Sequence, residues 1–245
     1  MTTYQFAPAV RQSIVPHRIE GDMVEEFLKE VNAKIDQDFK GNSLLKVLSM
    51  KKIRGVPLAV GSNSIILPVV ESVSPNYRTG RPEDLQRTLN DGDTLSIKEN
   101  NYVDLGAVID FTGRNHQMAL DFYQQLPKEL RDFDRLPSVV VGYGLKNFDA
   151  GNYGLGLVHA SNTQVRPAII LAGPSGNFRD EDVSLEIGLP TKLENGDRSL
   201  YTSTQKVQSL DSLGLSGLYL DRNLDLNSDD EDLAYSIGGG RVVLF

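Results

Sequence analysis

The sequence that decides the fold class begins at residue 138, where SVVVGYG (138–144) is followed by YGLGLVHAS (153–161). Both pieces are short, rich in apolar and β-branched residues, and bounded by Gly, Asn, Asp or Ser, which is typical of β-strands joined by turns. Four later pieces repeat the pattern: AIILAG (168–173), VSLEIGL (183–189), GLYLDR (217–222) and GRVVLF (240–245). We therefore predict strands in all six pieces, and no helix of useful length after residue 135.

The first half of the chain carries the helical signal, which is strongest in residues 23–39. Apolar residues recur there at intervals of three and four: Met23, Val24, Phe27, Leu28, Val31, Ile35 and Phe39. This spacing predicts an amphipathic helix whose apolar stripe packs on a core. Asp22 is the expected N-cap residue, with Glu25 as its capping-box partner. A second helix is predicted at 114–125, and a short one starting at Pro82.

Strands are also predicted in the first half, in IRGVPLAV (53–60), SIILPVVESV (64–73), TLSIKE (94–99) and YVDLGAVIDF (102–111). Helices in the first half and many short strands in the second indicate an α+β fold. We expect N-terminal helices packed on a mainly antiparallel, β-rich sheet that the C-terminal half completes. The chain is expected to form one domain over residues 1–245. The alternative is a boundary near residue 135, between a mixed α/β part (1–135) and a β-rich part (136–245).

Composition excludes several kinds of chemistry. The 245 residues contain no cysteine, which excludes a disulfide framework, a thiolate nucleophile and a cysteine-ligated zinc site. The formal net charge of −8 argues against non-specific nucleic-acid binding by the whole surface. The first residues lack a secretory pattern, and the apolar runs are far shorter than the roughly 20 residues of a membrane helix. We expect a cytoplasmic protein, or one within a particle assembled in the cytoplasm, with no membrane contact.

The acidic run from residue 221 to residue 232 is the one dense group of potential metal ligands. Its candidate ligands are Asp221, Asn223, Asp225 and Asp232. Oxygen ligands at alternate positions, with a carboxylate at the twelfth, are typical of a calcium loop, and magnesium is the other cation considered. Leu226 stands where such a loop needs glycine, and the twelfth residue is Asp rather than Glu. We therefore favour an acidic hairpin tip, with no cofactor.

A small basic group is the candidate nucleic-acid site. It consists of Lys51, Lys52 and Arg54, with Tyr77 as a residue on which a base can stack. Arg78 and Arg81 follow Tyr77 closely in the sequence. Groups of this size are common on protein surfaces, so the same residues also fit an ordinary solvated surface.

Other chemistry-bearing residues form no local signature. The carboxylates of interest lie in or beside predicted strands, at Asp104, Asp110, Glu186 and Glu194, and sequence alone does not show whether they converge. The three histidines, His17, His116 and His159, have no metal-ligand spacing. The glycines between residues 142 and 156 do not match a dinucleotide-binding fingerprint, and the segment after them predicts a strand rather than a helix.

These observations favour a non-catalytic role. We expect a structural or assembly subunit of a larger complex or particle, such as a phage structural component, with protein partners or self-association. The first alternative is a nucleic-acid-handling subunit or metal-dependent nuclease that uses the acidic run and the basic group. The second alternative is a small hydrolase with a dispersed site.

Overall fold

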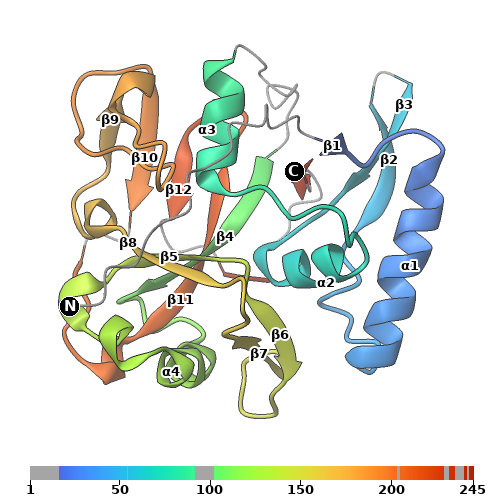
Figure 1. Cartoon of the computed structure of the whole chain (residues 1–245), viewed down its shortest axis with the longest axis horizontal. Helices are drawn as coiled ribbons and strands as arrows, with labels where there is room; N and C mark the ends of the chain where they lie inside the picture. Colours follow the sequence, from blue (N-terminus) through green and yellow to red (C-terminus); the bar gives the residue numbers. More distant parts are fainter. Residues whose placement is uncertain are drawn as a thin grey trace.

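The computed structural model describes most of the chain (Figure 1). The described residues are 17–53, 55–91, 102–202, 205–228, 232–234, 240–241 and 243–245. Among them, no helix has the length and apolar character needed to cross a membrane.

A mostly antiparallel sheet forms the middle of the described structure (Figure 1). Along its main path the strands are β2 (Ser49–Ile53), β3 (Val56–Val60), β13 (Gly240–Arg241), β4 (Tyr102–Asp110), β11 (Gly214–Leu220), β12 (Leu226–Ser228), β10 (Arg198–Thr202) and β9 (Gly176–Phe178). Two further strands extend it from β4, namely β5 (Ser138–Val141) and then β8 (Gln164–Pro167). The parallel pairs are β13 with β4 and β10 with β12. Strands from before and after residue 135 alternate in this order, because β4 lies between β13 and β11.

Two small sheets accompany the large one. β1 (His17–Arg18) pairs with β14 (Val243–Leu244), so the first and last described strands lie side by side. β6 (Gly144–Asn147) and β7 (Leu155–Val158) form a hairpin.

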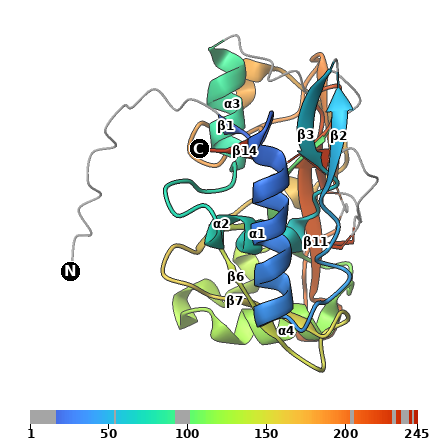
Figure 2. The same ribbon diagram turned by 90° about the vertical axis from the view of Figure 1, so that its right-hand side faces the viewer.

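Helices cover both faces of the large sheet, and each face has its own apolar core. One core packs α1 (Met23–Asp38), α2 (Leu67–Ser72) and α4 (His116–Gln125) against residues such as Ile109 and Leu215. Figure 2 shows α1 in front, with α2 beside it. The other core packs Leu85 of α3 (Pro82–Asn90) against Leu105 and Phe178. Short 3-10 turns connect these elements, at Ser64–Ile66, Lys128–Leu130, Phe133–Arg135, Ile169–Ala172, Asp180–Asp182 and Leu210–Ser212.

The predicted α+β class is confirmed, with N-terminal helices on a mainly antiparallel sheet that later strands complete. The predicted helices are confirmed in α1, α3 and α4. Val24, Val31 and Ile35 of α1 are buried, as are Met118, Ala119, Phe122 and Tyr123 of α4. Asp22 is the N-cap residue of α1, as predicted, but its dihedral angles are helical and its side chain makes no capping hydrogen bond, so the predicted capping box does not form.

Three predicted strands are wrong. Residues 64–73 form a 3-10 turn and then α2, because the Asn63 side chain accepts a hydrogen bond from the Ile66 amide and Pro68 lies in the first helical turn. AIILAG forms a 3-10 turn at Ile169–Ala172, and VSLEIGL forms turns apart from a single bridge between Val183 and Pro190. Short apolar runs fit a buried turn or helix as well as a strand, so their composition did not distinguish the two.

Two remaining predictions concern other segments. TLSIKE lies outside the described residues. GRVVLF forms strands at both of its ends, but these belong to different sheets, because β13 joins the large sheet and β14 pairs with β1.

Candidate functional site

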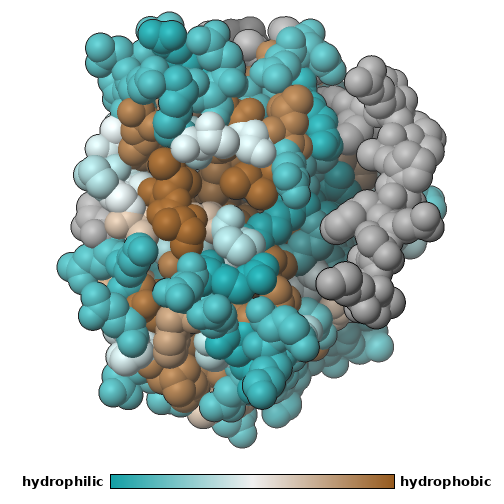
Figure 3. Space-filling model, turned by 60° about the vertical axis from the view of Figure 1, so that its left-hand side comes forward, coloured by the Kyte–Doolittle hydropathy of each residue, from teal (hydrophilic) through white to brown (hydrophobic). Residues whose placement is uncertain are grey.

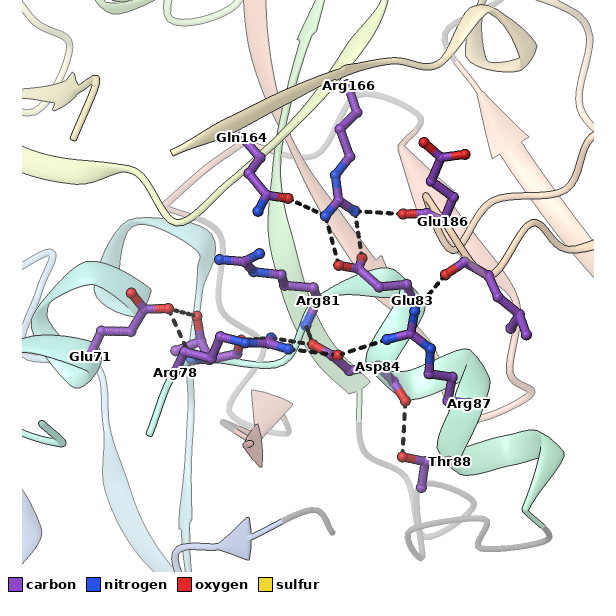
Figure 4. Close-up of polar contacts among 12 residues, drawn as sticks. Glu71, Arg78, Arg81, Glu83, Asp84, Arg87, Thr88, Gln164, Arg166 and Glu186 are labelled. Carbon is purple, nitrogen blue, oxygen red and sulfur yellow. Dashed lines mark hydrogen bonds and ion pairs between the residues drawn. The ribbon is translucent and has the colours of Figure 1, made fainter. Parts of the chain in front are cut away.

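Four arginines gather where the connection between α2 and α3 meets β8 (Figure 4). This arginine cluster consists of Arg78 and Arg81 in the connection, Arg87 on α3, and Arg166 on β8. Pro82 is the first residue of α3, a position where proline is tolerated because the first N–H groups of a helix make no intrahelical hydrogen bond. Glu83 and Asp84 follow in the first helical turn, and both pair with arginines of the cluster.

Asp84 is the centre of the first ion-pair group. Its side chain is fully buried and accepts a two-point contact from the Arg78 guanidinium, in which Nη2 lies 2.8 Å from Oδ1 and Nη1 contacts Oδ2. The backbone amide of Arg81 donates to Oδ2 at 3.1 Å, and Arg87 Nη1 lies 3.8 Å from Oδ1. The hydrogen bonds that Arg78 donates to Asp84 raise the pKa of Arg78, so this guanidinium is held charged and paired.

Glu83 is the centre of the second ion-pair group, in which it pairs with Arg166 of β8. Arg166 Nη2 donates to Oε1 at 2.9 Å, and Nη1 lies 2.8 Å from Oε2 in an ion pair whose angles do not make a hydrogen bond. Arg166 Nη1 also donates to the carbonyl oxygen of Glu186 at 3.0 Å, and Nη2 to the side chain of Gln164. Arg166 thus joins β8 to both α3 and the 183–189 turns.

Arg81 differs from the other members of the cluster. Figure 4 shows its guanidinium turned away from the Glu83 and Asp84 carboxylates. Among the described residues this guanidinium has no hydrogen bond or ion pair, and its buried Nε has no hydrogen-bond partner. Burial lowers the pKa of Arg81, and the positive charge of Arg78 lowers it further, while Glu83 opposes both effects. A buried N–H such as Nε of Arg81 is costly to leave without a hydrogen-bond partner.

A cavity of about 530 Å³ lies next to the cluster, between α1, α2 and β6. Its walls include Tyr77, Arg78, Tyr143 and Asn162, and Lys34 of α1 stands at its edge. Lys34 is paired with Asp38 at 2.8 Å. The cavity has the volume of a small-molecule site, which is roughly 300–1,000 Å³.

The predicted metal ligands serve the local turn in this structure. Asp221 Oδ1 accepts from the amides of Asn223 at 2.7 Å and Asp225 at 3.1 Å, and Asp225 Oδ1 accepts from the Ser199 amide at 2.6 Å. Asp232 Oδ1 instead accepts from the amide of Ala234 at 3.0 Å and from a tyrosine hydroxyl. Within the described residues, no group of three or more His, Asp or Glu is placed to hold a metal ion. Residues 229–231 lie outside them, and the metal site stays a prediction.

The first residues of the acidic run, 221–225, form the tip of a hairpin between the antiparallel strands β11 and β12, but the run is not one long connection. Its middle forms β12 (Leu226–Ser228), which pairs with β10 and β11. Burial raises the pKa of Asp225, with the Ser199 amide opposing the shift.

The predicted nucleic-acid residues lie on different elements. Lys51 and Lys52 are exposed on β2, at one edge of the large sheet, where lysines hinder unwanted pairing between sheet edges. Tyr77 is exposed in the loop after α2, beside the 530 Å³ cavity. Arg54 lies outside the described residues.

The four carboxylates flagged in the sequence have separate surroundings. Asp104 accepts from the Ser62 hydroxyl, while Asp110 accepts from the Ser216 hydroxyl and from the Thr112 amide at 2.9 Å. Both aspartates lie on β4, but a bulge near Gly106 interrupts the alternation of side chains between the two faces of the sheet. Before the bulge, Val103 and Leu105 contribute to the same core as Val108 after it. Ala107 and Ile109 contribute to the core on the other face. Asp104 and Asp110 therefore face opposite sides of the sheet and do not form an acid–base pair.

The other two carboxylates are exposed. Glu186 contributes its backbone carbonyl to the arginine cluster, and Glu194 is paired with Lys192 at 2.9 Å. Sequence reasoning missed Arg166 and the Glu83–Asp84 pair as parts of one site. Pro82 followed by two acids was a usable signal for the first turn of α3, but nothing in the sequence placed β8 beside it.

An apolar patch adjoins the cluster. It consists of Ile169, Ile170, Leu185 and Ile187, on the 3-10 turn after β8 and on the 183–189 turns. Ile169 is 41% exposed and Leu185 44% exposed, whereas Ile170 and Ile187 rest partly buried on the core beneath. Figure 3 shows apolar side chains gathered in a band on the side of the molecule that carries β8 and β9.

Comparison of the chain with models of known protein families, with curated proteins and with solved structures finds no match.

Proposed function

We propose that the chain is a non-catalytic assembly subunit that associates with further copies of itself through the 169–187 apolar patch. The observation that carries this proposal is the exposure of Ile169 and Leu185, each of which lies one or two residues from a side chain, Ile170 or Ile187, that packs on the same core. Large apolar side chains grouped on a surface mark protein–protein contacts more often than single exposed ones do.

The charges around the patch support a second copy as the partner. Arg87 donates a hydrogen bond to the carbonyl oxygen of Leu185, and its side chain is 42% exposed. Glu181 lies just before the 183–189 turns in the sequence, and its side chain is 73% exposed. A two-fold interface brings each surface against the same surface of the other copy, so a rim that carries both signs of charge is complementary to itself. The net charge of −8 opposes association at long range, and added salt should weaken that repulsion.

The test is the molar mass in solution, measured by size-exclusion chromatography with light scattering over a wide range of protein concentration. We expect a dimer or larger assembly for the wild-type chain, and monomers for Ile169→Asp and Leu185→Asp. A charge buried in the contact costs several kcal/mol, so the dissociation constant should rise at least about a hundredfold.

Leu44→Asp is the matched control. Leu44 is 38% exposed, but it lies in the connection between α1 and β2, away from the patch. The control should assemble like the wild type. A wild-type chain that stays monomeric at all concentrations, or a Leu44→Asp variant that dissociates as fully as Leu185→Asp, would overturn the proposal.

A further inference from the structure

Arg81 has the surroundings of a binding residue rather than a structural one. Arg78 and Arg166 each neutralise a buried carboxylate, so removing either leaves an acid without its partner. Removing the Arg81 guanidinium leaves no described residue without a partner, because it pairs with none. A half-buried guanidinium that stabilises nothing in the fold is explained by a ligand that it pairs with.

The charges of the cluster point to an anion. Three guanidinium groups, those of Arg78, Arg87 and Arg166, lie against the carboxylates of Glu83 and Asp84, whereas the fourth, that of Arg81, points away from them. The nearby Glu71 carboxylate accepts from the Thr79 hydroxyl at 2.6 Å. Four positive charges against three negative ones leave one in excess, and the unpaired group is Arg81. An anionic oxygen group is therefore the complement that this part of the fold lacks.

Gly142 packs between the Arg81 guanidinium and the backbone of Asn162. Gly142 has a φ of +65°, and a Cβ at this position would lie 3.2 Å from Arg81 Nη2 and 2.6 Å from the carbonyl oxygen of Asn162. Asn162 and Arg78 both line the 530 Å³ cavity. Arg81 itself does not line the cavity, but its Nη2 lies close to Asn162, which does.

The remaining walls indicate the size and kind of ligand. Arg78 also lines the cavity, but its guanidinium is already paired with Asp84, so the planar fork of Arg81 is the group left to pair with a phosphate. Tyr77 is 42% exposed at the same cavity and offers a ring on which a flat base can stack. We infer that Arg81 binds the phosphate group of a nucleotide-sized small molecule whose remaining part occupies the cavity beside Tyr77 and Asn162.

The experiment measures binding to the full chain by calorimetric titration, with inorganic phosphate and adenosine monophosphate as the two ligands. We expect both to bind, and the nucleotide to bind at least tenfold more tightly, because it also contacts the cavity and Tyr77. Arg81→Gln should lose at least tenfold in affinity for both. Tyr77→Ala should weaken nucleotide binding and leave phosphate binding unchanged.

Arg131→Gln is the matched control, since Arg131 is an exposed arginine at the end of the Lys128–Leu130 turn, and its side chain also has no hydrogen-bond or ion-pair partner within the part of the chain that the structure describes. It should bind like the wild type. Arg81→Gln should melt no lower than the wild type, so that a loss of binding reports on the ligand and not on folding. Arg81→Lys, which keeps the charge and loses the planar fork, should bind with intermediate affinity.

Several results would overturn the inference. These are no binding of either ligand at millimolar concentration, equal affinity of wild type and Arg81→Gln, or equal affinity for phosphate and nucleotide. A single-stranded oligonucleotide that binds more tightly than the nucleotide would also overturn it, because such a strand is read along a surface groove and not in this cavity. None of these results depends on the oligomeric state of the chain.

Discussion

The ion pair between Arg78 and Asp84 should be among the most stabilising side-chain contacts in this fold, and Arg78→Met tests it. The Asp84 side chain is fully buried, and the Arg78 side chain is 33% exposed. The backbone of Arg78 is held independently, because its N–H and C=O both pair with Phe245, at 3.0 and 2.9 Å. The substitution therefore removes the guanidinium and keeps the loop in place.

The expected cost follows from what Asp84 retains. Removing one partner of a buried ion pair costs about 3–5 kcal/mol, because the remaining charge stays buried. Asp84 still accepts from the Arg81 amide, and Arg87 stays within 3.8 Å, so we expect the lower end of that range, about 3 kcal/mol. At about 2–4 °C per kcal/mol for a chain of this length, the melting temperature should fall by about 6–12 °C.

The assay is thermal unfolding followed by circular dichroism, with urea unfolding as a second measurement. Arg81→Met is the matched control, three positions away, and should melt at or above the wild-type temperature because it removes a charge without a partner. The double variant Arg78→Met/Asp84→Leu should recover much of the loss, because it removes both charges. A fall of less than about 1 °C for Arg78→Met, or equal falls for Arg78→Met and Arg81→Met, would refute the reasoning.

Three further predictions concern other parts of the fold. Deleting residues 241–245 should cost about 5 kcal/mol or prevent folding, because β14, buried Leu244 and the pairing with Arg78 are lost together; a melting curve checks this. Val31→Asp, in a side chain that is 1% exposed, should cost at least about 3 kcal/mol, whereas Met23→Asp on the same helix, where 60% is exposed, should change the urea midpoint little. Burial raises the pKa of Asp225 above 3.8, so the folded protein holds that proton more tightly than the unfolded chain does. The free energy of unfolding should then fall as the pH rises through the folded-state pKa, and Asp225→Asn should remove this fall in urea titrations at a series of pH values.

The sequence predicted correctly those parts of the fold in which the pattern of apolar residues fits only one type of secondary structure. The stripe that includes Val31 and Ile35 repeats for four turns, and only a helix buries all of it on one side. Residues 64–73 are apolar on nearly every side, so they show no period, and the helix there depends on the Asn63 cap and on where Pro68 falls. Periodicity is therefore informative only where one side of an element faces water.

The candidate site was predictable only in its local part. Arg78 and Arg81 were noticed as neighbours of Tyr77 because they are close in the sequence. Arg166 completes the cluster from β8, and its place beside α3 follows from how β5 and β8 extend the sheet. The bulge near Gly106 is a similar case, because one extra residue in β4 exchanges the faces of every side chain that follows it.

The pairing of β1 with β14 has a consequence for how the molecule is made. His17 lies opposite Leu244, which is synthesised 227 positions later (244 minus 17). At translation rates of about 5–20 residues per second, β1 waits about 11–45 s for its partner. The loop that carries Arg78 waits about 8–33 s, because it pairs with Phe245, which is synthesised 167 positions later (245 minus 78). Strands such as β4 and β5 can pair while the chain is still growing, but the corner that holds the arginine cluster closes only after the last strand has left the ribosome.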